Sequence, residues 1–200
     1  MRTGIFGGTF SPPHIGHVRA AACFQSALSL DELLVIPAFV PPNKIDSSIL
    51  PPEKRLAMCR LAFDGIPGCT VSDIELRRGG TSYTVLTLRE LERSDRELFL
   101  LVGTDMFLTL SRWRSPEEIF SRATIVAAGR FSDPTLKRDT EKAKAALEKE
   151  YGARIVLLDN PITEISSTFL REKILTGDDL SAWLPEKVEA YIRKENLYHV

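Results

Sequence analysis

Residues 3–17 read TGIFGGTFSPPHIGH, and the fold that we predict starts from this stretch. Residues 3–6 form a short apolar run typical of a buried strand, and Gly7 and Gly8 are predicted to end it. A helical pattern of apolar residues then runs from about residue 14 to residue 28. The stretch therefore predicts a strand, a glycine-rich loop and the start of a helix, which together form the first unit of an α/β protein.

The same alternation continues along the chain. Further strands are predicted at residues 33–36, 70–72, 98–102, 125–128 and 155–158. Helices are predicted from residue 51 and from residue 115, and at residues 83–91, 133–151, 168–175 and 186–194. Apolar strands between helices indicate a Rossmann-like, doubly wound parallel sheet with helices on both faces. In such a fold, ligands bind beyond the carboxyl ends of the strands.

Two predicted helix starts have local signals. Pro51 is followed by Pro52, and proline fits the first turn of a helix. Ser115 is followed by Pro116 and, three residues after the serine, by Glu118, which predicts a capping box with Ser115 as the cap.

Length and composition limit the classes of protein. A chain of 200 residues predicts one domain over residues 1–200, with residues 165–200 as a small C-terminal helical part. The formal net charge of −1 argues against broad contact with nucleic acid or a membrane surface. No apolar stretch is long enough for a signal peptide or a membrane span, so a cytoplasmic location is expected. Three cysteines without metal-type spacing predict reduced thiols.

The loop after the first strand has the parts of a phosphate site. Gly7 and Gly8 let the backbone approach a ligand, and a helix N-terminus favours anions. His14 and His17 are spaced so that their imidazoles share one face. A zinc half-site is the alternative, but a catalytic zinc needs a third protein ligand, and the remaining histidine is His199. The glycine spacing fits neither a Walker loop nor the dinucleotide fingerprint.

Two stretches resemble a known superfamily. Gly7-Gly8-Thr9-Phe10 followed by His14-Ile15-Gly16-His17 resembles the signature of the nucleotidyltransferases with the His-x-Gly-His motif, which class I aminoacyl-tRNA synthetases share. Residues 165–171, ISSTFLR, resemble the second signature of the family. Over residues 3–198 the chain is similar to the bacterial nicotinate-mononucleotide adenylyltransferases, notably at residues 37–44, 55–58, 75–84 and 103–105 and at Trp113. It departs from them at Ser11, where the family often has an acid, and at Asn43, where it often has histidine.

The resemblance implies adenylyl transfer from ATP to nicotinate mononucleotide, giving deamido-NAD and pyrophosphate in NAD biosynthesis. The attacking phosphate is ionised at neutral pH, so the protein has only to align the substrates and stabilise charge on phosphate oxygens. By resemblance, the catalytic residues are His14, His17 and Arg171. The implied ATP-binding residues are Gly7, Gly8, Thr9, Phe10, Gly103, Asp105, Ile165, Ser166, Ser167 and Thr168. The implied mononucleotide-binding residues are Lys44, Tyr83, Thr84 and Trp113. Magnesium is expected to arrive with ATP, and no protein ligand is assigned to it.

Several alternatives stay open at this point. Trp113 could be a core residue, Lys44 a solvated charge, Asp105 a first-turn acid, and Ser166 with its neighbours a plain helix cap. A sister enzyme acting on nicotinamide mononucleotide or phosphopantetheine, or a cytidylyltransferase, would use the same phosphate-binding residues. A non-catalytic nucleotide-binding module is the rival from another class, and homo-oligomer formation stays open. A synthetase is disfavoured because 200 residues leave no room for a tRNA-binding domain.

Overall fold

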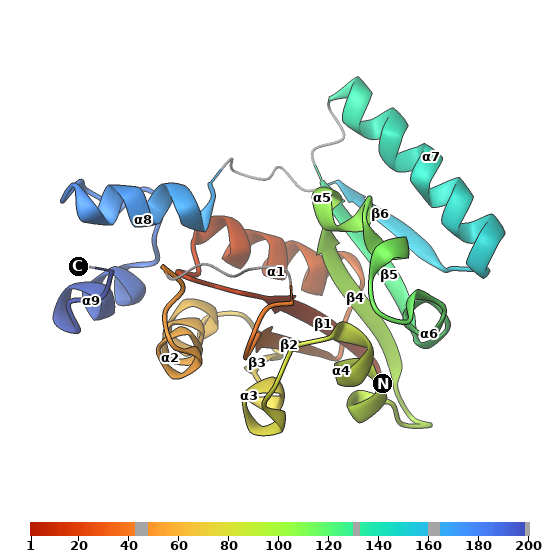
Figure 1. Ribbon diagram of the computed structural model, residues 1–200, viewed down its shortest axis with the longest axis horizontal. Helices are drawn as coiled ribbons and strands as arrows, with labels where there is room; N and C mark the ends of the chain where they lie inside the picture. Colours follow the sequence, from red (N-terminus) through yellow and green to blue (C-terminus); the bar gives the residue numbers. More distant parts are fainter. Residues whose placement is uncertain (43–47, 130–132, 160–164, 199–200) are drawn as a thin grey trace.

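The computed structural model describes residues 1–42, 48–129, 133–159 and 165–198. In these ranges one parallel sheet contains six strands, in the order β3-β2-β1-β4-β5-β6 (Figure 1). The strands are β1 (Arg2–Gly8), β2 (Glu32–Pro37), β3 (Cys69–Val71), β4 (Glu97–Gly103), β5 (Ala123–Gly129) and β6 (Ile155–Asp159). This is the strand order of doubly wound dinucleotide-binding folds, and it confirms the predicted fold class.

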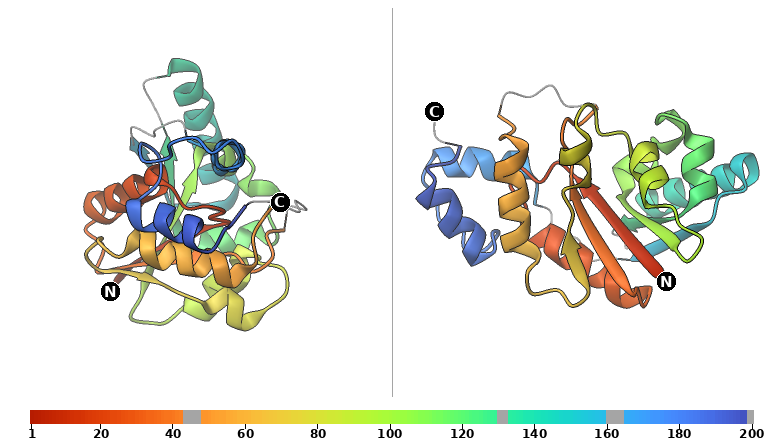
Figure 2. Two further views of the ribbon diagram at one scale, coloured as in Figure 1. Left: turned by 90° about the vertical axis from the view of Figure 1, so that its left-hand side faces the viewer. Right: turned by 90° about the horizontal axis from the view of Figure 1, so that it is seen from below.

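The helices cover both faces of the sheet (Figures 1 and 2). They are α1 (Ile15–Ala27), α2 (Pro52–Phe63), α3 (Ile74–Arg78), α4 (Thr84–Leu91), α5 (Thr104–Phe107), α6 (Pro116–Arg122), α7 (Pro134–Tyr151), α8 (Ser167–Leu175) and α9 (Glu186–Lys194), with a 3₁₀ turn η1 (Leu110–Arg112). Helices α8 and α9 lie with α2 at one end of the molecule, and α7 lies at the other. None of these helices is long and apolar enough to cross a membrane.

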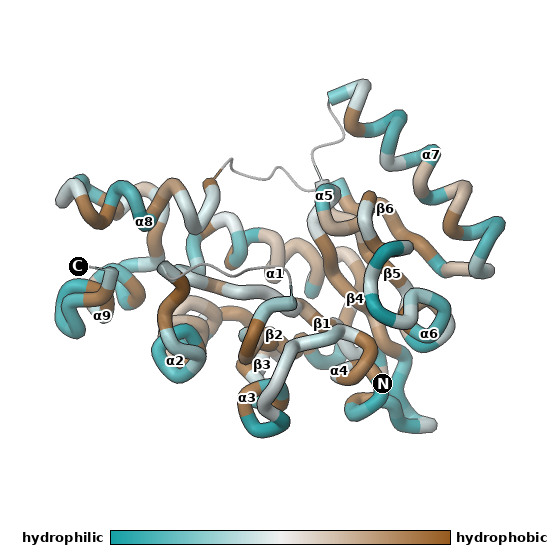
Figure 3. The backbone as a smooth tube through the Cα atoms, viewed as in Figure 1, coloured by the Kyte–Doolittle hydropathy of each residue, from teal (hydrophilic) through white to brown (hydrophobic). Residues whose placement is uncertain are grey.

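Alternating side chains of each strand supply two separate cores. In β4, Phe99 and Leu101 pack into a cluster with apolar residues of α1, α2, α8 and α9. Leu98, Leu100 and Val102 pack on the opposite face with α4, α6 and α7. Because successive side chains of a strand point to opposite faces, a continuous apolar run is what a sheet covered on both sides requires. The strands are accordingly the most hydrophobic part of the backbone, whereas α7 carries many hydrophilic residues (Figure 3).

Most of the predicted elements are confirmed, with three corrections. Gly7 and Gly8 do not end the first strand, because both continue the pairing of β1 with β2. Ser115 is not a capping-box residue: its backbone is left-handed (φ 52°, ψ 60°) and its side chain caps nothing, although α6 begins at Pro116 as expected. The sequence patterns missed α3, α5 and η1, whose five, four and three residues are too few to show a period.

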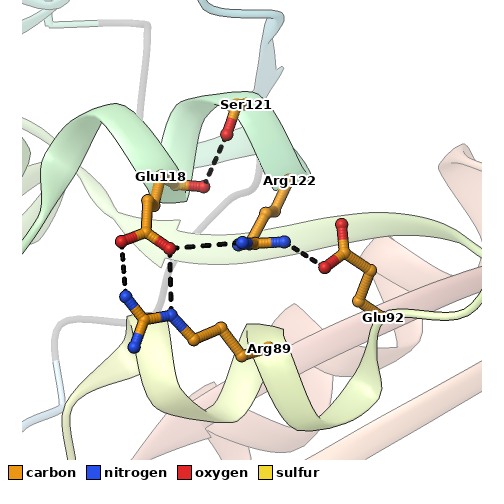
Figure 4. A network of polar contacts seen from close by, with 5 residues as sticks. All are labelled: Arg89, Glu92, Glu118, Ser121 and Arg122. Atoms are coloured by element: carbon orange, nitrogen blue, oxygen red, sulfur yellow. Dashed lines mark hydrogen bonds and ion pairs between the residues drawn. The ribbon is translucent and has the colours of Figure 1, made fainter.

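A network of ion pairs ties α4 to α6 (Figure 4). Arg89 of α4 donates two hydrogen bonds to the carboxylate of Glu118 in α6, and Arg122 donates another to the same group at 3.2 Å. The hydrogen bond from Arg89 is the main reason that the pKa of Glu118 is lowered. The network thus links the helix that begins at Thr84 with the helix that follows Trp113.

The three cysteines are free thiols, which confirms the prediction. Cys59 is fully buried in α2, and burial raises its pKa. Burial raises the pKa of Cys69 to about 11. Both side chains therefore act as small apolar groups of the core at neutral pH.

Candidate active site

A cavity of about 650 Å³ opens beyond the carboxyl ends of β1 and β4, the central strands at which the chain order of the sheet reverses. This is the place where doubly wound sheets bind their ligands. The lining residues come from the loop after β1, the start of α1, the end of β4 and the start of α8. They are Phe6, Thr9, Ser11, His14, Gly16, His17, Ala20, Ile49, Leu101, Gly103, Asp105, Ala128, Ile165, Ser166, Ser167, Thr168 and Arg171.

The two sequence signatures meet at this cavity. The hydroxyl of Ser167 donates to the carbonyl oxygen of Pro12 at 2.9 Å, across 155 residues of chain. The guanidinium of Arg171 donates to the carbonyl oxygen of Ser11 at 2.9 Å. The N-terminal turn of α8 is thereby held against the loop that follows β1. Sequence alone predicted both signatures as parts of one site, and the structure brings them into direct contact.

His14 and His17 form a reciprocal cap at the start of α1. The Nδ1 atom of His14 accepts from the backbone N–H of His17 at 3.3 Å, and the Nδ1 atom of His17 accepts from the backbone N–H of His14 at 3.2 Å. The two rings stack with their centroids 3.7 Å apart. Because each Nδ1 is an acceptor, each neutral ring carries its hydrogen on Nε2. The cap therefore leaves two imidazoles with Nε2–H donors on the wall of one cavity.

Burial keeps His14 neutral. The residue is 5% exposed, and desolvation lowers its pKa from the ordinary value of 6.5 to about 4. Over the pH range in which most enzymes work, a neutral imidazole can donate a hydrogen bond without first losing or gaining a proton.

We expect this histidine to make the folded state less stable in acid. In the unfolded chain His14 takes up a proton near pH 6.5, whereas in the folded chain it does so only near pH 4. The contribution of His14 to stability is therefore complete above pH 6.5 and is lost as the pH falls from 6.5 to 4. The loss of free energy of unfolding should reach about 3 kcal/mol at pH 4.

Urea unfolding at pH 7 and pH 4 checks this expectation. The variant His14→Asn keeps a side-chain acceptor at the cap but does not titrate. It should lose about 3 kcal/mol less than the parent protein between the two pH values. An identical pH dependence in both proteins would show that His14 is not the titrating group.

The start of α8 presents helix N–H groups to the cavity. Ser166 is its N-cap, with the hydroxyl accepting from the backbone N–H of Phe169 at 3.1 Å. Thr168 accepts at its hydroxyl from Arg171 at 3.3 Å. The plain-cap interpretation is therefore right for Ser166, yet the same turn lines the cavity. The first N–H groups of a helix lack partners within the helix, and they favour a bound anion.

Other residues predicted to bind ATP divide into two sets. Thr9, Ile165, Gly103 and Asp105 lie on the cavity wall, with Asp105 exposed in the first turn of α5. The remaining three, Gly7, Gly8 and Phe10, are outside the lining.

Two residues of this second set pack against each other. Phe10 is 2% exposed, and its ring meets the ring of His17 edge-on with 5.0 Å between centroids. A Cβ atom at Gly8 would lie 2.9 Å from the ring of Phe10, closer than Cβ atoms are found. Gly8 thus makes room for Phe10, and Phe10 supports the histidine. Gly7 is exposed near the end of β1, and a Cβ there would lie 4.0 Å from the backbone oxygen of Ile36, an ordinary contact.

The three described residues that were predicted to bind the mononucleotide, Tyr83, Thr84 and Trp113, are not among the lining residues. Tyr83 is the N-cap of α4, Thr84 is its first residue, and Trp113 follows η1. Tyr83 and Trp113 are half-buried against the second core cluster, as the core interpretation of Trp113 expects. The guanidinium of Arg114, which the sequence gave no reason to single out, lies 4.6 Å above the ring of Tyr83.

Three positions named from the sequence fall outside the described residues. They are Lys44, Asn43 and His199. The other departure from the family, Ser11, is described and lines the cavity. Its hydroxyl accepts from the backbone N–H of Leu50 at 3.3 Å and lies 3.0 Å from the hydroxyl of Tyr198. Ser11 therefore binds neighbouring segments of the protein where the family often has an acid.

Protein donors for a metal ion are sparse in the described parts of the chain. They contain no group of three histidine, cysteine, aspartate or glutamate residues that could hold one. Among the lining residues, Asp105 has the one carboxylate. This donor set fits an ion that is bound mainly by substrate phosphates and water, as Mg²⁺ commonly is.

Comparison with known proteins gives consistent matches. The family model described as Cytidylyltransferase-like matches residues 5–173. A protein of Roseiflexus sp. (strain RS-1), named "Probable nicotinate-nucleotide adenylyltransferase", is 41% identical over 196 residues, which cover 98% of this chain and 96% of the relative. A protein of the same name from Desulfatibacillum aliphaticivorans is 36% identical over 215 residues, covering 99% of this chain and 100% of the relative.

Solved structures share the fold. The nicotinic acid mononucleotide adenylyltransferase of Plasmodium falciparum, complexed with NaAD, matches with a TM-score of 0.75 at 17% identity, over 98% of this chain and 97% of that one. The same protein complexed with APC matches with a TM-score of 0.73 at 16% identity, over 98% and 96%.

Proposed function

Since this chain belongs to the cytidylyltransferase-like family and, within it, to the nicotinate-nucleotide adenylyltransferases, we propose that it transfers the adenylyl group of ATP to nicotinate mononucleotide. The phosphate of the mononucleotide attacks the α-phosphorus of ATP, the bond from this phosphorus to the bridging oxygen breaks, and pyrophosphate leaves. The products are deamido-NAD and pyrophosphate. The observation that carries the proposal is the pair of imidazole Nε2–H donors on the wall of a cavity at the switch point of the sheet.

His14 and His17 donate to the α-phosphate and to the bridging oxygen of the leaving group. Negative charge grows on these oxygens as the bond to pyrophosphate breaks, and donors already in place stabilise it without reorganisation. The reciprocal cap supplies this preorganisation, because each ring is held at Nδ1 by the main chain.

The start of α8 binds the β- and γ-phosphates. Ile165, Ser166, Ser167 and Thr168 form a turn whose N–H groups favour an anion, and Arg171 adds a guanidinium one turn into the helix. At the end of β4 and the start of α5, Gly103 and Asp105 bind the adenosine part, with the carboxylate of Asp105 accepting from a hydroxyl or an amine. Gly7, Gly8, Thr9 and Phe10 supply main-chain groups at the end of β1 and in the loop that follows it.

The nicotinate ring binds near Tyr83, Thr84 and Trp113. The pyridinium ring of the mononucleotide is cationic, and the face of a tryptophan attracts a cation. Lys44 binds the phosphate of the mononucleotide in this scheme.

Nucleotidyltransferases of this kind typically need a divalent metal with ATP. We propose Mg²⁺, bound by the triphosphate and water with Asp105 as the nearest protein carboxylate on the cavity wall. When bound, the ion neutralises charge on the phosphate oxygens. Alignment of the two substrates and hydrogen bonding to the leaving group are left to the protein.

Release of pyrophosphate tests the proposed function. The protein is mixed with ATP and Mg²⁺, and nicotinate mononucleotide is compared with nicotinamide mononucleotide at equal concentration. Strong preference for the acid is the expected result, and equal use would widen the function to both acceptors. Turnover with neither, followed by turnover with phosphopantetheine, would point to the sister enzyme. Binding of ATP without release of pyrophosphate with any of these acceptors would identify a non-catalytic nucleotide-binding module.

Trp113→Ala should raise the KM for nicotinate mononucleotide by about tenfold or more and leave the KM for ATP within about twofold, because stacking on a cation contributes roughly 2 kcal/mol where water is excluded. Trp113→Phe keeps an aromatic face and should recover part of the loss. Initial rates with each substrate varied in turn give both constants. Equal increases of the two KM values would show that Trp113 is not part of the acceptor site.

A further inference from the structure

Arg55 of α2 is a buried cation with no carboxylate partner among the residues that the structure describes. The side chain is 1% exposed and ranks first by volume among the fully buried side chains. It forms no salt bridge with any residue that the structure describes. Burial lowers the pKa of its guanidinium. A buried arginine without an acidic partner has to be satisfied by other groups, and those groups indicate its purpose.

The guanidinium binds carbonyl oxygens from three separate segments. Its Nε atom donates to Leu50 at 2.8 Å, one terminal nitrogen donates to Thr9 at 2.9 Å, and the other donates to Phe39 at 3.0 Å. The loop after β1, the loop after β2 and the segment before α2 are therefore joined at one planar group. A guanidinium suits this arrangement because its N–H groups are fixed in one plane and point outward from separate nitrogens.

The bond to Thr9 also sets the direction of the next N–H group. The peptide between Thr9 and Phe10 is trans, so its carbonyl oxygen and its N–H point in opposite directions. Because the oxygen faces Arg55 inside the protein, the N–H of Phe10 faces away from Arg55. It has no acceptor among the residues that the structure describes. Phe10 has a left-handed backbone (φ 51°), which a phenylalanine adopts only when its surroundings impose it.

Two of the three segments line the cavity. Thr9 lines it directly, and Ile49, which precedes Leu50, lines it from the segment before α2. Arg55 therefore connects the wall beside the histidines with the wall that Ile49 contributes, from a position behind both.

We propose that Arg55 is a positioning residue for adenylyl transfer: it fixes the Thr9–Phe10 peptide in the loop beside the histidines, and it holds this loop in register with the loop after β2 and the segment before α2. This inference rests on the proposed function. Arg55 itself touches neither substrate, so its loss should lower kcat by misaligning groups that do. A displacement of about 1 Å in such groups can cost on the order of 10²-fold.

The test compares variants of one helix. Arg55→Met keeps the length of the side chain and removes all three donors, and kcat should fall on the order of 10²-fold. Arg55→Lys keeps the charge but cannot reach three carbonyls, so its kcat should lie between those of the parent protein and Arg55→Met. The KM for ATP should change by less than tenfold in both. If Arg55→Met does not fold, the kcat of Arg55→Lys tests the proposal.

Two control variants separate positioning from stability. Met58→Ala empties a fully buried position of the same helix and keeps all three hydrogen bonds of Arg55, and Arg60→Met removes an exposed charge from the helix. We expect Met58→Ala to lower the melting temperature as much as Arg55→Lys while leaving kcat of the folded protein within about twofold. Arg60→Met should change neither.

Either of two outcomes overturns the inference. In the first, the kcat of Arg55→Lys stays within about twofold of that of the parent protein. In the second, Met58→Ala has the same melting temperature as Arg55→Lys and loses as much kcat. Failure of the proposed function has a different signature, because the parent protein would then release no pyrophosphate with nicotinate mononucleotide. The Arg55 variants would in that case be assayed with the acceptor that the parent protein does use, since Arg55 lies behind the ATP side of the cavity.

Discussion

His17→Ala is expected to lower kcat by about 10²–10³-fold, which corresponds to a loss of about 2.7–4 kcal/mol of transition-state stabilisation. The Nε2–H of His17 is one of two imidazole donors on the cavity wall, and alanine leaves the developing charge on the phosphate without it. Steady-state release of pyrophosphate at saturating ATP and mononucleotide measures the effect. Near-normal activity would rule out the phosphate role of this residue.

His17 also stabilises the start of α1, so a second variant has to separate the two roles. The Nδ1 atom of His17 accepts from the backbone N–H of the N-cap residue, His14. His17 is the third residue of the helix, a position at which a capping box favours glutamine. His17→Gln should therefore keep the melting temperature near that of the parent protein and still lose most of kcat. His17→Ala should lose kcat together with about 1 kcal/mol of stability. If only His17→Ala were impaired, the histidine would be a cap and not a catalytic donor.

Arg171→Ala is expected to reduce kcat/KM for ATP by about 10- to 150-fold, because a hydrogen bond to a charged group contributes about 1.5–3 kcal/mol. The guanidinium lies at the start of α8 and donates to the carbonyl oxygen of Ser11, so it is positioned where the two signatures meet. In the reverse direction the KM for pyrophosphate should rise similarly. Inhibition by AMP should be unchanged, since AMP lacks the β- and γ-phosphates.

Lys173→Ala provides the matched control. Lys173 lies on the same helix and pairs with Asp178 at 3.0 Å on the surface, outside the cavity lining. Its removal deletes one positive charge without touching the site, so kcat/KM for ATP should stay within about twofold. An equal loss of kcat/KM in Lys173→Ala and Arg171→Ala would show that the effect of Arg171 comes from net charge. If pyrophosphate inhibited the parent protein and Arg171→Ala equally, Arg171 would not be part of the phosphate site.

Much of the fold was open to prediction because its signals are local. Residues 98–102 and 125–128 are continuous apolar runs, and only a strand buried on both faces requires such a run. Asp133 caps α7 through the N–H groups of Thr135 and Leu136, and Gly152 ends it with φ 62°, in agreement with the helix predicted at residues 133–151. Ser115 shows the limit of such signals, since its pattern fits a capping box while its left-handed backbone makes no cap.

The site was predictable as two segments and not as one arrangement. The spacing of His14 and His17 and the run ISSTFLR indicated phosphate chemistry, and both lie on the same cavity. The domain boundaries and the roles of individual residues stay predictions. Arg114 gave no functional signal in the sequence, because an isolated arginine is usually a surface charge. Arg55 belongs to a stretch that resembles the family, residues 55–58, but the sequence assigned no role to it.

By itself, the sequence determined the strand and helix order, the parallel sheet and the two motifs, because each depends on hydrophobic period, turn residues or a short spacing along the chain. Tertiary structure alone decided that Gly8 makes room for Phe10, that the paired Nδ1 atoms leave Nε2–H donors, and that Arg55 joins three loops. Such features depend on distances between atoms far apart in the chain. Those distances exist only once the sheet has brought the ends of β1 and β4 together with the start of α8.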